Sequence, residues 1–245
     1  MTPTIKVNDA APLRNVAAFM TLMNRMVDRD LDLPGLAVFY GRSGWGKTKA
    51  GMMAAVRHRA IYVECGKFTT AKDLMTLILE ELGVENPRGS ISRMLWQAIE
   101  LMAAERRPLI VDEAHFIAVK GFVDLLREIS DKATATVILI GEEKLPADLE
   151  AHERVHNRVL EWLPAVPCDA SDFKLLAATR CRGLEIAPDL ADSILQDTKG
   201  NTRRIVINLS KAQQAAQLKG VTRVDLAAFG GRDAIEREHN HRVRA

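Results

Sequence analysis

Short apolar runs alternate with amphipathic stretches over much of this chain. The apolar runs are 36–40, 61–63, 109–111 and 136–140. Each run is too short for a helix and is bounded by glycine or polar residues, so each predicts a buried strand. Helical spacing of apolar residues predicts helices at 47–58, 71–82, 94–104 and 120–129. Strands that alternate with helices are typical of an α/β fold with a mostly parallel sheet flanked by helices.

The pattern differs at both ends of this alternation. Residues 13–29 place apolar side chains at helical spacing, and after residue 167 only helices are predicted. Those helices are expected at 171–181, 188–197, 202–218 and 223–229. We therefore expect an N-terminal helical segment (1–34), an α/β core (35–167), a small all-helical domain (168–230) and a C-terminal tail (231–245).

The composition is that of an ordinary globular protein. The 245 residues are 47% hydrophobic and 27% charged, with a formal net charge of +2, so the chain is long enough to bury a core. No apolar run reaches about 18 residues, and the first residues lack the layout of a signal peptide, so we expect no membrane span and a cytoplasmic location. Cys65, Cys168 and Cys181 are far apart in sequence and are expected to be reduced thiols.

The first functional motif is GRSGWGKT at 41–48, which matches the pattern G-x-x-x-x-G-K-[ST] completely. In such a loop the glycines allow backbone N–H groups to face phosphates, and the following helix adds its positive N-terminal end. Lys47 is expected to reach the β- and γ-phosphates, and Thr48 to bind Mg²⁺. The expected phosphate-binding residues are Gly41, Arg42, Ser43, Gly44, Trp45, Gly46, Lys47 and Thr48.

The second motif follows the apolar run 109–111. Asp112 and Glu113 stand at its carboxyl end, where open α/β sheets bind their ligands. Asp112 is expected to hold Mg²⁺, mainly through water, and Glu113 to polarise the water that attacks the γ-phosphate. Together with the phosphate-binding loop, these residues predict an enzyme that hydrolyses a nucleoside triphosphate with the help of Mg²⁺.

With these motifs the sequence resembles the AAA+ ATPases over about residues 35–220, and more narrowly the transposition ATPases, the group of the phage Mu transposition protein B. The narrower resemblance rests on the stretches TVILIGEEKL, ERVHNRVLEWLP and GNTRRI. It implies a P-loop AAA+ core with a helical lid, and ATP as the nucleotide. The order Asp-Glu-Ala-His at 112–115 also occurs in helicases, but a helicase core needs a second α/β lobe, which this sequence does not predict.

The resemblance implies roles for several charged residues. Arg203 in the GNTRRI stretch corresponds to the sensor-2 arginine, which reaches the γ-phosphate. Arg158, or alternatively Arg154, corresponds to an arginine finger that completes the site of a neighbouring subunit. Many relatives have a polar sensor-1 residue where this chain has Glu142. A carboxylate there would repel phosphate, so we expect slow hydrolysis that DNA or a partner stimulates.

The same resemblance implies that ATP assembles the protomers into a ring or a helical filament on double-stranded DNA, which is then delivered to a transposase. Contacts to the DNA backbone would give little sequence preference. The DNA-binding positions are expected at Lys67, Thr69, Lys72 and Arg88. Aromatic residues make up 5% of the chain, so base stacking on single strands is not expected.

Two other functions remain open: an ATPase of secretion or pilus assembly, and a replication loader or signalling NTPase that acts on a protein partner. The secretion class shares the Gly-Glu-x-x-Leu order found at 141–145, but it usually carries a membrane-binding segment. Basic residues outnumber acidic ones at 42–72 and 198–223. Such an excess suits an anionic partner, and it is also typical of solvated helix faces.

Overall fold

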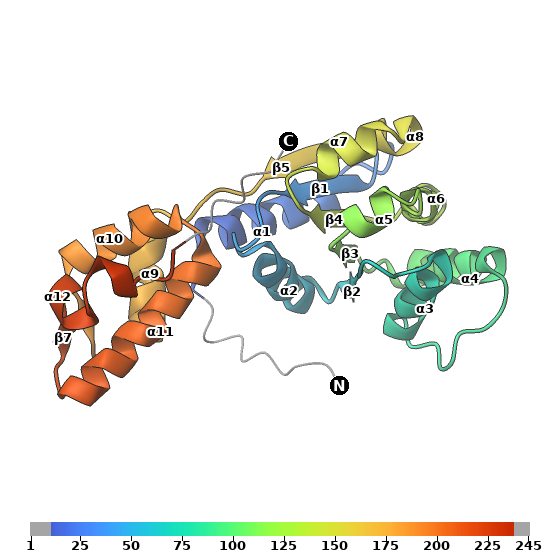
Figure 1. The fold of residues 1–245 in the computed structure, drawn as a ribbon. Helices are drawn as coiled ribbons and strands as arrows, with labels where there is room; N and C mark the ends of the chain where they lie inside the picture. The colour runs from blue at the N-terminus through green and yellow to red at the C-terminus, as the bar shows by residue number, and fades with distance from the viewer. Residues whose placement is uncertain (1–10, 238–245) are drawn as a thin grey trace. The chain divides into compact units, whose positions relative to one another are not determined.

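The computed structural model describes residues 11–237 and contains a five-stranded sheet with the strand order β2-β3-β4-β1-β5 (Figure 1). Its strands are β1 (Leu36–Tyr40), β2 (Ile61–Glu64), β3 (Leu109–Asp112), β4 (Val137–Gly141) and β5 (Val159–Pro164). Neighbouring strands pair in parallel, so their carboxyl ends lie at one edge of the sheet. The predicted α/β fold class, a parallel sheet flanked by helices, is confirmed.

The chain forms two compact units, and the sheet belongs to the unit of residues 15–42 and 47–165. The helices of this part of the chain are α1 (Arg14–Val27), α2 (Lys47–His58), α3 (Ala71–Glu81), α4 (Ile91–Glu105), α5 (His115–Ala118), α6 (Val123–Ala133), α7 (Leu145–Glu150) and α8 (Glu153–His156). The helix predicted at 120–129 was placed too early. Gly121 has a left-handed φ of +75°, which ends the turns after α5 and delays the start of α6.

Strand β5 was not predicted from the sequence. It pairs with β1 at one edge of the sheet, and most of its residues are only half-buried. Its sequence VLEWLP contains a glutamate and ends in proline, so it lacks the continuous apolar character of the central strands. An edge strand tolerates both residues because one of its sides is not paired with another strand.

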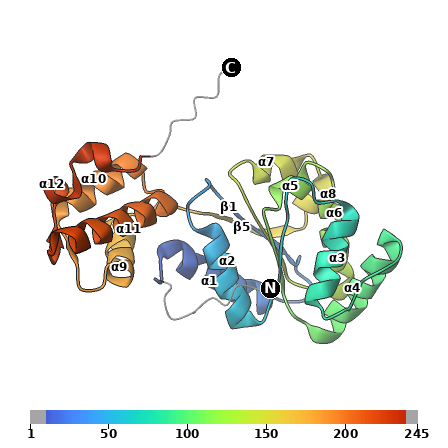
Figure 2. The same ribbon diagram turned by 60° about the horizontal axis from the view of Figure 1, so that its bottom comes forward.

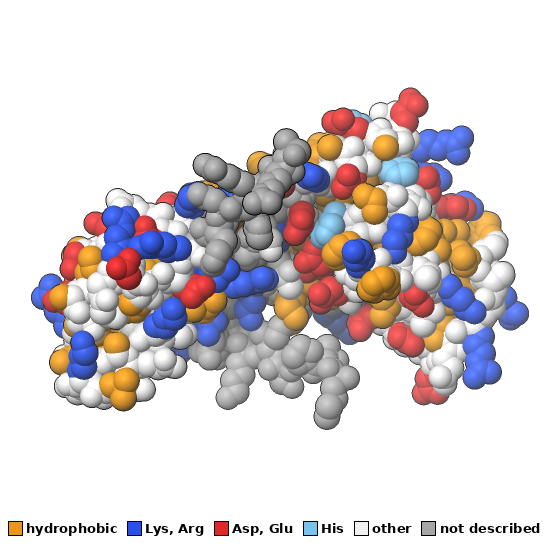
Figure 3. All heavy atoms as spheres, in the orientation of Figure 1, with side chains coloured by type: hydrophobic (Ala, Val, Ile, Leu, Met, Phe, Trp, Pro, Cys, Tyr) orange, Lys and Arg blue, Asp and Glu red, His pale blue; other side chains and the backbone are white. Residues whose placement is uncertain are grey.

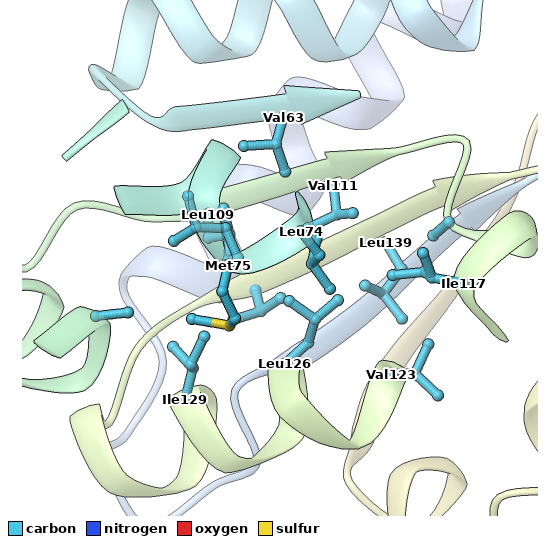
Figure 4. Packing of buried hydrophobic residues seen from close by; sticks show 14 of the residues in the cluster. Val63, Leu74, Met75, Leu109, Val111, Ile117, Val123, Leu126, Ile129 and Leu139 are labelled. Atoms are coloured by element: carbon cyan, nitrogen blue, oxygen red, sulfur yellow. The ribbon is translucent and has the colours of Figure 1, made fainter. Parts of the chain in front are cut away.

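Alternate side chains of the sheet pack against two different layers of helices. Figure 4 shows one layer, in which strand residues Val63, Val111 and Leu139 lie beside Leu74 and Met75 of α3 and Leu126 and Ile129 of α6. Successive strand residues point to opposite faces, so Phe39 and Ile140 lie on the other face. There Phe39 contacts Phe19 of α1, with ring centroids 5.1 Å apart. Gly51 of α2 has no side chain, which allows α2 to approach Ile140 closely.

The second compact unit contains residues 166–237 together with 11–14 and 43–46 (Figure 2). Its helices are α9 (Ala170–Arg180), α10 (Pro188–Thr198), α11 (Thr202–Lys219), α12 (Leu226–Phe229) and a 3₁₀ helix (Arg232–Ala234). A short parallel ladder of β6 (Glu185–Ile186) and β7 (Arg223–Val224) accompanies them. The helix predicted at 223–229 was therefore wrong at its start, because residues 223 and 224 pair with β6.

The two terminal segments expected from the sequence lie partly outside the described residues. Residues 1–10 of the N-terminal segment (1–34) and residues 238–245 of the tail (231–245) are in this category. Within residues 11–237, no helix is both long enough and apolar enough to cross a membrane. Figure 3 shows acidic and basic side chains interspersed over the visible face of each unit, so contacts with an anionic partner have to be argued from particular residues.

Candidate nucleotide site

The expected phosphate-binding loop joins β1 to α2. Gly44 and Gly46 have φ values of +82° and +83°, a left-handed conformation that residues with a side chain rarely adopt. These positions let the loop curl and place Lys47 at the first residue of α2. Arg42 and Ser43 are exposed and Trp45 is half-buried. The backbone is thus compatible with a cradle of N–H groups for phosphates, in front of a positive helix end.

Lys47 is buried at the loop, with 8% of its surface exposed. Its Nζ atom donates hydrogen bonds to the carbonyl oxygens of Gly41, at 2.6 Å, and Arg42, at 3.0 Å. A buried ammonium group needs such partners, and a phosphate would offer it a stronger, anionic one. Thr48 follows in the first turn of α2 and is exposed, so its hydroxyl is accessible to a ligand.

Asp112 ends β3 and is 1% exposed. Its Oδ1 atom accepts a hydrogen bond from the backbone N–H of Glu113 at 2.8 Å, and its Oδ2 atom accepts one from the Tyr62 hydroxyl at 2.6 Å. Burial, followed by the charge of Asp112, raises the pKa of Tyr62 far above its ordinary value, so the phenol remains a proton donor. The orientation of the carboxylate is therefore fixed by two donors, one from β2 and one from the residue that follows β3.

Glu113 directly follows β3 in an unusual backbone conformation. Its φ is +55°, in the left-handed region that is uncommon for residues other than glycine and often found at functional sites. Its carboxylate lies 3.3 Å from Nδ1 of His115. Burial raises the pKa of the Glu113 carboxyl, and the charge of Asp112 adds to this increase. His115 and Lys47 act in the opposite direction, so the carboxyl group is held among charges of both signs.

Residues 30–148, which include this site, match the family model described as an AAA domain. Residues 30–148 are therefore similar to an AAA domain, and we refer to them by this name. No curated protein sequence is significantly similar to the chain.

The solved structures extend this finding to the fold of most of the chain. The ORC2 protein of Aeropyrum pernix, solved as complexes with ADPNP and ADP, aligns with a TM-score of 0.66 at 15% identity, over 90% of this chain and 66% of that chain. Cdc6p of Pyrobaculum aerophilum aligns with a TM-score of 0.66 at 20% identity, over 91% and 66% of the two chains. The ORC1 protein of A. pernix, solved in complex with DNA, aligns with a TM-score of 0.66 at 20% identity, over 95% and 67%. The chain thus has the fold of an AAA+ P-loop ATPase, and it spans about two thirds of the length of these proteins.

Glu142, the residue expected at the sensor-1 position, and Glu143 follow β4 as two exposed carboxylates. Glu143 pairs with Arg42 of the phosphate-binding loop, with 3.7 Å between Oε2 and Nε. The charge of Glu142 contributes to the raised pKa of Glu113, which is consistent with a position near the site. The expected effect of Glu142, slow hydrolysis, stays a prediction.

Arg203 lies in the first turn of α11 within the second unit and is exposed. The side chain of Asn201 caps this helix by accepting a hydrogen bond from the N–H of Arg204 at 3.2 Å. Its Nδ2 atom also donates to the carbonyl of Ser43 at 3.2 Å, and the N–H of Arg203 donates to the carbonyl of Gly44 at 3.0 Å. Residues 43–46 therefore contact the start of α11 inside the same unit, while the sensor-2 role of Arg203 stays a prediction.

The two arginine-finger candidates differ in their partners. Arg158 precedes β5 and pairs with Asp131 of α6 at 3.3 Å, and Asp131 also pairs with Arg127. Arg154 lies in α8 and is exposed. Because the side chain of Arg158 is 52% exposed, its ion pair is weak, and the arginine-finger role stays a prediction.

Two of the expected DNA-binding residues lie on one tight turn after β2. Thr69 closes this turn, because its Oγ1 atom accepts a hydrogen bond from the N–H of Gly66 at 2.8 Å. Lys120, which the sequence did not single out, holds the turn from outside by donating to the carbonyls of Lys67, at 2.7 Å, and Thr69, at 2.9 Å. Lys67 is exposed, so its side chain is accessible to a partner.

The remaining DNA-binding candidates lie at opposite ends of α3. Lys72 is in its first turn, beside the tight turn 66–69, whereas Arg88 follows the helix. An eleven-residue helix is about 16 Å long. The structure thus places Lys72 directly after the turn with Lys67 and Thr69, whereas Arg88 lies in the connection between α3 and α4.

Three residues at these sites were not assigned a role from the sequence: Tyr62, His115 and Lys120. Tyr62 and Lys120 each act on a residue that lies on another strand or beyond a loop, and no spacing rule relates such partners. Tyr62 offered a weak signal, since a tyrosine in a buried strand needs a partner for its hydroxyl. His115 follows Glu113 closely, but its histidine ring was interpreted as an ordinary loop residue.

Proposed function

We propose that the AAA domain binds ATP with Mg²⁺ and hydrolyses it. The observation that carries this proposal is the arrangement of Lys47 at the head of α2 and of Asp112 and Glu113 at the carboxyl end of β3. The Thr48 hydroxyl and the Asp112 carboxylate are oxygen ligands of the kind that suits Mg²⁺, which keeps several waters and phosphate oxygens in its shell.

Each protein group has a defined task in this reaction. Lys47 exchanges its carbonyl partners for the β- and γ-phosphates and neutralises part of their charge. Bound Mg²⁺ would supply further charge neutralisation at the same oxygens. Glu113 orients the attacking water, for which its carboxylate has to be ionised and turned away from His115. Burial and the charge of Asp112 oppose this ionisation most strongly, and the charge of Glu142 adds to them, which is a physical reason to expect slow turnover that DNA or a partner stimulates.

We further propose that the ATP-bound protein assembles as a ring or filament on double-stranded DNA without sequence preference, and delivers this DNA to a transposase. The support for the DNA step is the exposed Lys67 on a turn that Lys120 stiffens, with Lys72 beside it. Lysines at such a turn would contact phosphates, which carry no sequence information. The transposase is proposed from the sequence resemblance to the transposition ATPases.

The DNA step is tested by binding random-sequence duplex with and without ATP at several salt concentrations. Lys67→Ala is expected to weaken binding on every sequence and to reduce the salt slope by about 1, as for the loss of one phosphate contact. Lys174→Ala removes the same charge from the exposed surface of α9 and is the matched control, with no expected change. An unaltered salt slope for Lys67→Ala would remove this turn from the DNA-binding surface.

A second candidate, loading of a replication protein, is favoured by the fold likeness to the ORC and Cdc6 proteins. The two candidates predict different partners for the same ATPase. Stimulation of strand transfer into random-sequence DNA by a transposase supports the first. Recruitment of a replicative helicase to DNA, without any effect on strand transfer, would replace it with the second.

A further inference from the structure

We propose that Tyr62 is a positioning residue: its hydroxyl fixes the orientation of the Asp112 carboxylate, which would hold the Mg²⁺ that accompanies the nucleotide. The inference rests on the proposed ATPase function and deepens it. The Tyr62 hydroxyl donates to Asp112 Oδ2 at 2.6 Å, a short hydrogen bond to a charged acceptor.

The register of the sheet brings these two side chains together. In the parallel pair of β2 and β3, Tyr62 lies opposite Ile110, and Glu64 lies opposite Asp112. Residues two apart on a strand share a face, so Tyr62 and Asp112 project from the same face of the sheet. The side chain of Tyr62 therefore extends along this face, and its ring is long enough to bring the hydroxyl to Asp112 at the end of β3.

The position of the ring depends on a glycine of α2. A Cβ atom at Gly51 would lie 3.3 Å from Cε2 of Tyr62 and 2.6 Å from Cδ1 of Ile140, so a side chain there would press on both. Glycine is disfavoured in a helix interior, and its presence here leaves room for the tyrosine. The same helix carries Lys47 and Thr48 in its first turn, so Tyr62 packs between the strand that ends in Asp112 and the helix of the phosphate-binding loop.

The hydrogen bond matters because Asp112 is almost completely buried. Its Oδ1 atom accepts the N–H of Glu113 and its Oδ2 atom accepts the Tyr62 hydroxyl. Without the hydroxyl, a buried carboxylate oxygen loses its donor, and only the N–H of Glu113 then restrains rotation of the carboxylate about the Cβ–Cγ bond. A partner that orients a metal ligand in this way typically changes metal affinity by roughly 10- to 100-fold.

The test is the Mg²⁺ dependence of binding of a fluorescent ATP analogue, measured with the full chain. Tyr62→Phe keeps the ring and removes only the hydroxyl. We expect unchanged affinity for the analogue in EDTA, and about a 10-fold increase in the Mg²⁺ concentration that gives half of the affinity gain. The control is Thr136→Val, which is expected to leave the Mg²⁺ requirement unchanged. It removes a buried hydroxyl that precedes β4, at the other end of the sheet, and donates to the Met26 carbonyl.

A second comparison separates positioning from a general loss of stability. In an Asp112→Asn background, Tyr62→Phe is expected to have no additional effect on the Mg²⁺ requirement. An additional effect there, or an unchanged requirement for Tyr62→Phe alone, would overturn the inference. If the wild-type protein gains no affinity from Mg²⁺, the proposed ATPase function fails as well, whereas a normal wild-type response with an unaffected Tyr62→Phe variant refutes the tyrosine alone.

Discussion

The backbone of Glu113 illustrates how a single residue carries both strain and chemistry. Its left-handed conformation costs about 1–3 kcal/mol, and the hydrogen bond from its N–H to Asp112 helps to maintain it. The same conformation turns the chain sharply after β3, so that His115 returns to within 3.3 Å of the Glu113 carboxylate. The strained backbone therefore places the Glu113 carboxylate beside two of the charged groups that shift its pKa, Asp112 and His115.

At Lys47 the charge of one ammonium group is expected to dominate nucleotide affinity. Lys47→Ala removes a donor that is buried at the loop, and a hydrogen bond to a charged group contributes about 1.5–3 kcal/mol. We expect ATP binding to weaken by roughly 10- to 100-fold in equilibrium titrations. The exposed Lys49 in the same turn of α2 is the matched control, and Lys49→Ala is expected to bind ATP normally. Equal affinities for the two variants would contradict the role of Lys47.

At the scale of residues, the sequence predicts what depends on local spacing. Gly44, Gly46 and Lys47 belong to one short motif, because the turn and the helix start must follow one another directly. The Tyr62–Asp112 pair could not be predicted, since its two residues are 50 positions apart in sequence and meet only through the register of β2 and β3. Which side chains surround a predicted catalytic group therefore required the structure.

Elements of the second unit are tied together by charged pairs as well as by an apolar core. Arg232 of the 3₁₀ helix donates to both carboxylate oxygens of Asp197 in α10, with the shortest distance 2.8 Å. The Asp197 side chain is 12% exposed, so this pair is better shielded than an ordinary surface pair. It fixes the last described segment of the chain onto α10.

Removal of the Asp197–Arg232 pair is expected to lower the stability of the fold by an amount that depends on pH. The hydrogen bond from Arg232, followed by its charge, lowers the pKa of Asp197 in the folded protein. A lowered folded pKa stabilises the fold above the unfolded pKa of about 3.9, and this stabilisation is lost as the pH falls toward the folded pKa. Asp197→Asn is expected to cost about 1 kcal/mol at pH 7 and progressively less below about pH 4.

The measurement for Asp197→Asn is urea unfolding of wild type and variant between pH 3 and pH 7. Asp192→Asn, which neutralises an exposed carboxylate on the same helix, is the control and is expected to match the wild type. A difference between wild type and Asp197→Asn that does not shrink on acidification would contradict the assigned cause.

At the scale of elements, strands and helices were predictable where their apolar pattern is continuous. Strands β1, β3 and β4 are buried and read as short apolar runs, whereas β5 lies at the edge and mixes polar with apolar residues. The ladder of β6 and β7 was missed for a different reason. Each of its strands has only two residues, too few for any periodicity.

At the scale of the whole molecule, most of the chain has the fold of AAA+ proteins, and a fold alone does not identify binding partners. The likeness to the ORC and Cdc6 structures covers 90–95% of the chain at 15–20% identity, which fixes the fold and not the target. Binding partners are selected by exposed residues such as Lys67, whose identity is not dictated by the core. Local motifs of the sequence therefore predict the nucleotide chemistry, whereas the prediction of a macromolecular partner rests on resemblance.

Assembly into a ring or filament predicts that one subunit completes the site of the next. Arg158→Ala is expected to lower ATP turnover by about 10³-fold while leaving ATP affinity unchanged, as for other arginine fingers. Mixing it with Glu113→Gln protein is expected to restore part of the activity, because an intact Glu113 then meets an intact Arg158 at some interfaces. Arg154→Ala is the matched control from the neighbouring helix α8. A loss of turnover with Arg154→Ala instead would move the finger to that residue.

The central claim is that the AAA domain hydrolyses ATP with Glu113 as the residue that orients water. The most direct measurement is ATP turnover of wild type and Glu113→Gln, with equilibrium ATP binding determined on the same samples and random-sequence duplex present. We predict that the variant binds ATP like the wild type and hydrolyses it at least about 100-fold more slowly. Turnover by the variant at the wild-type rate, or a wild-type protein that binds ATP without hydrolysing it, would contradict the account.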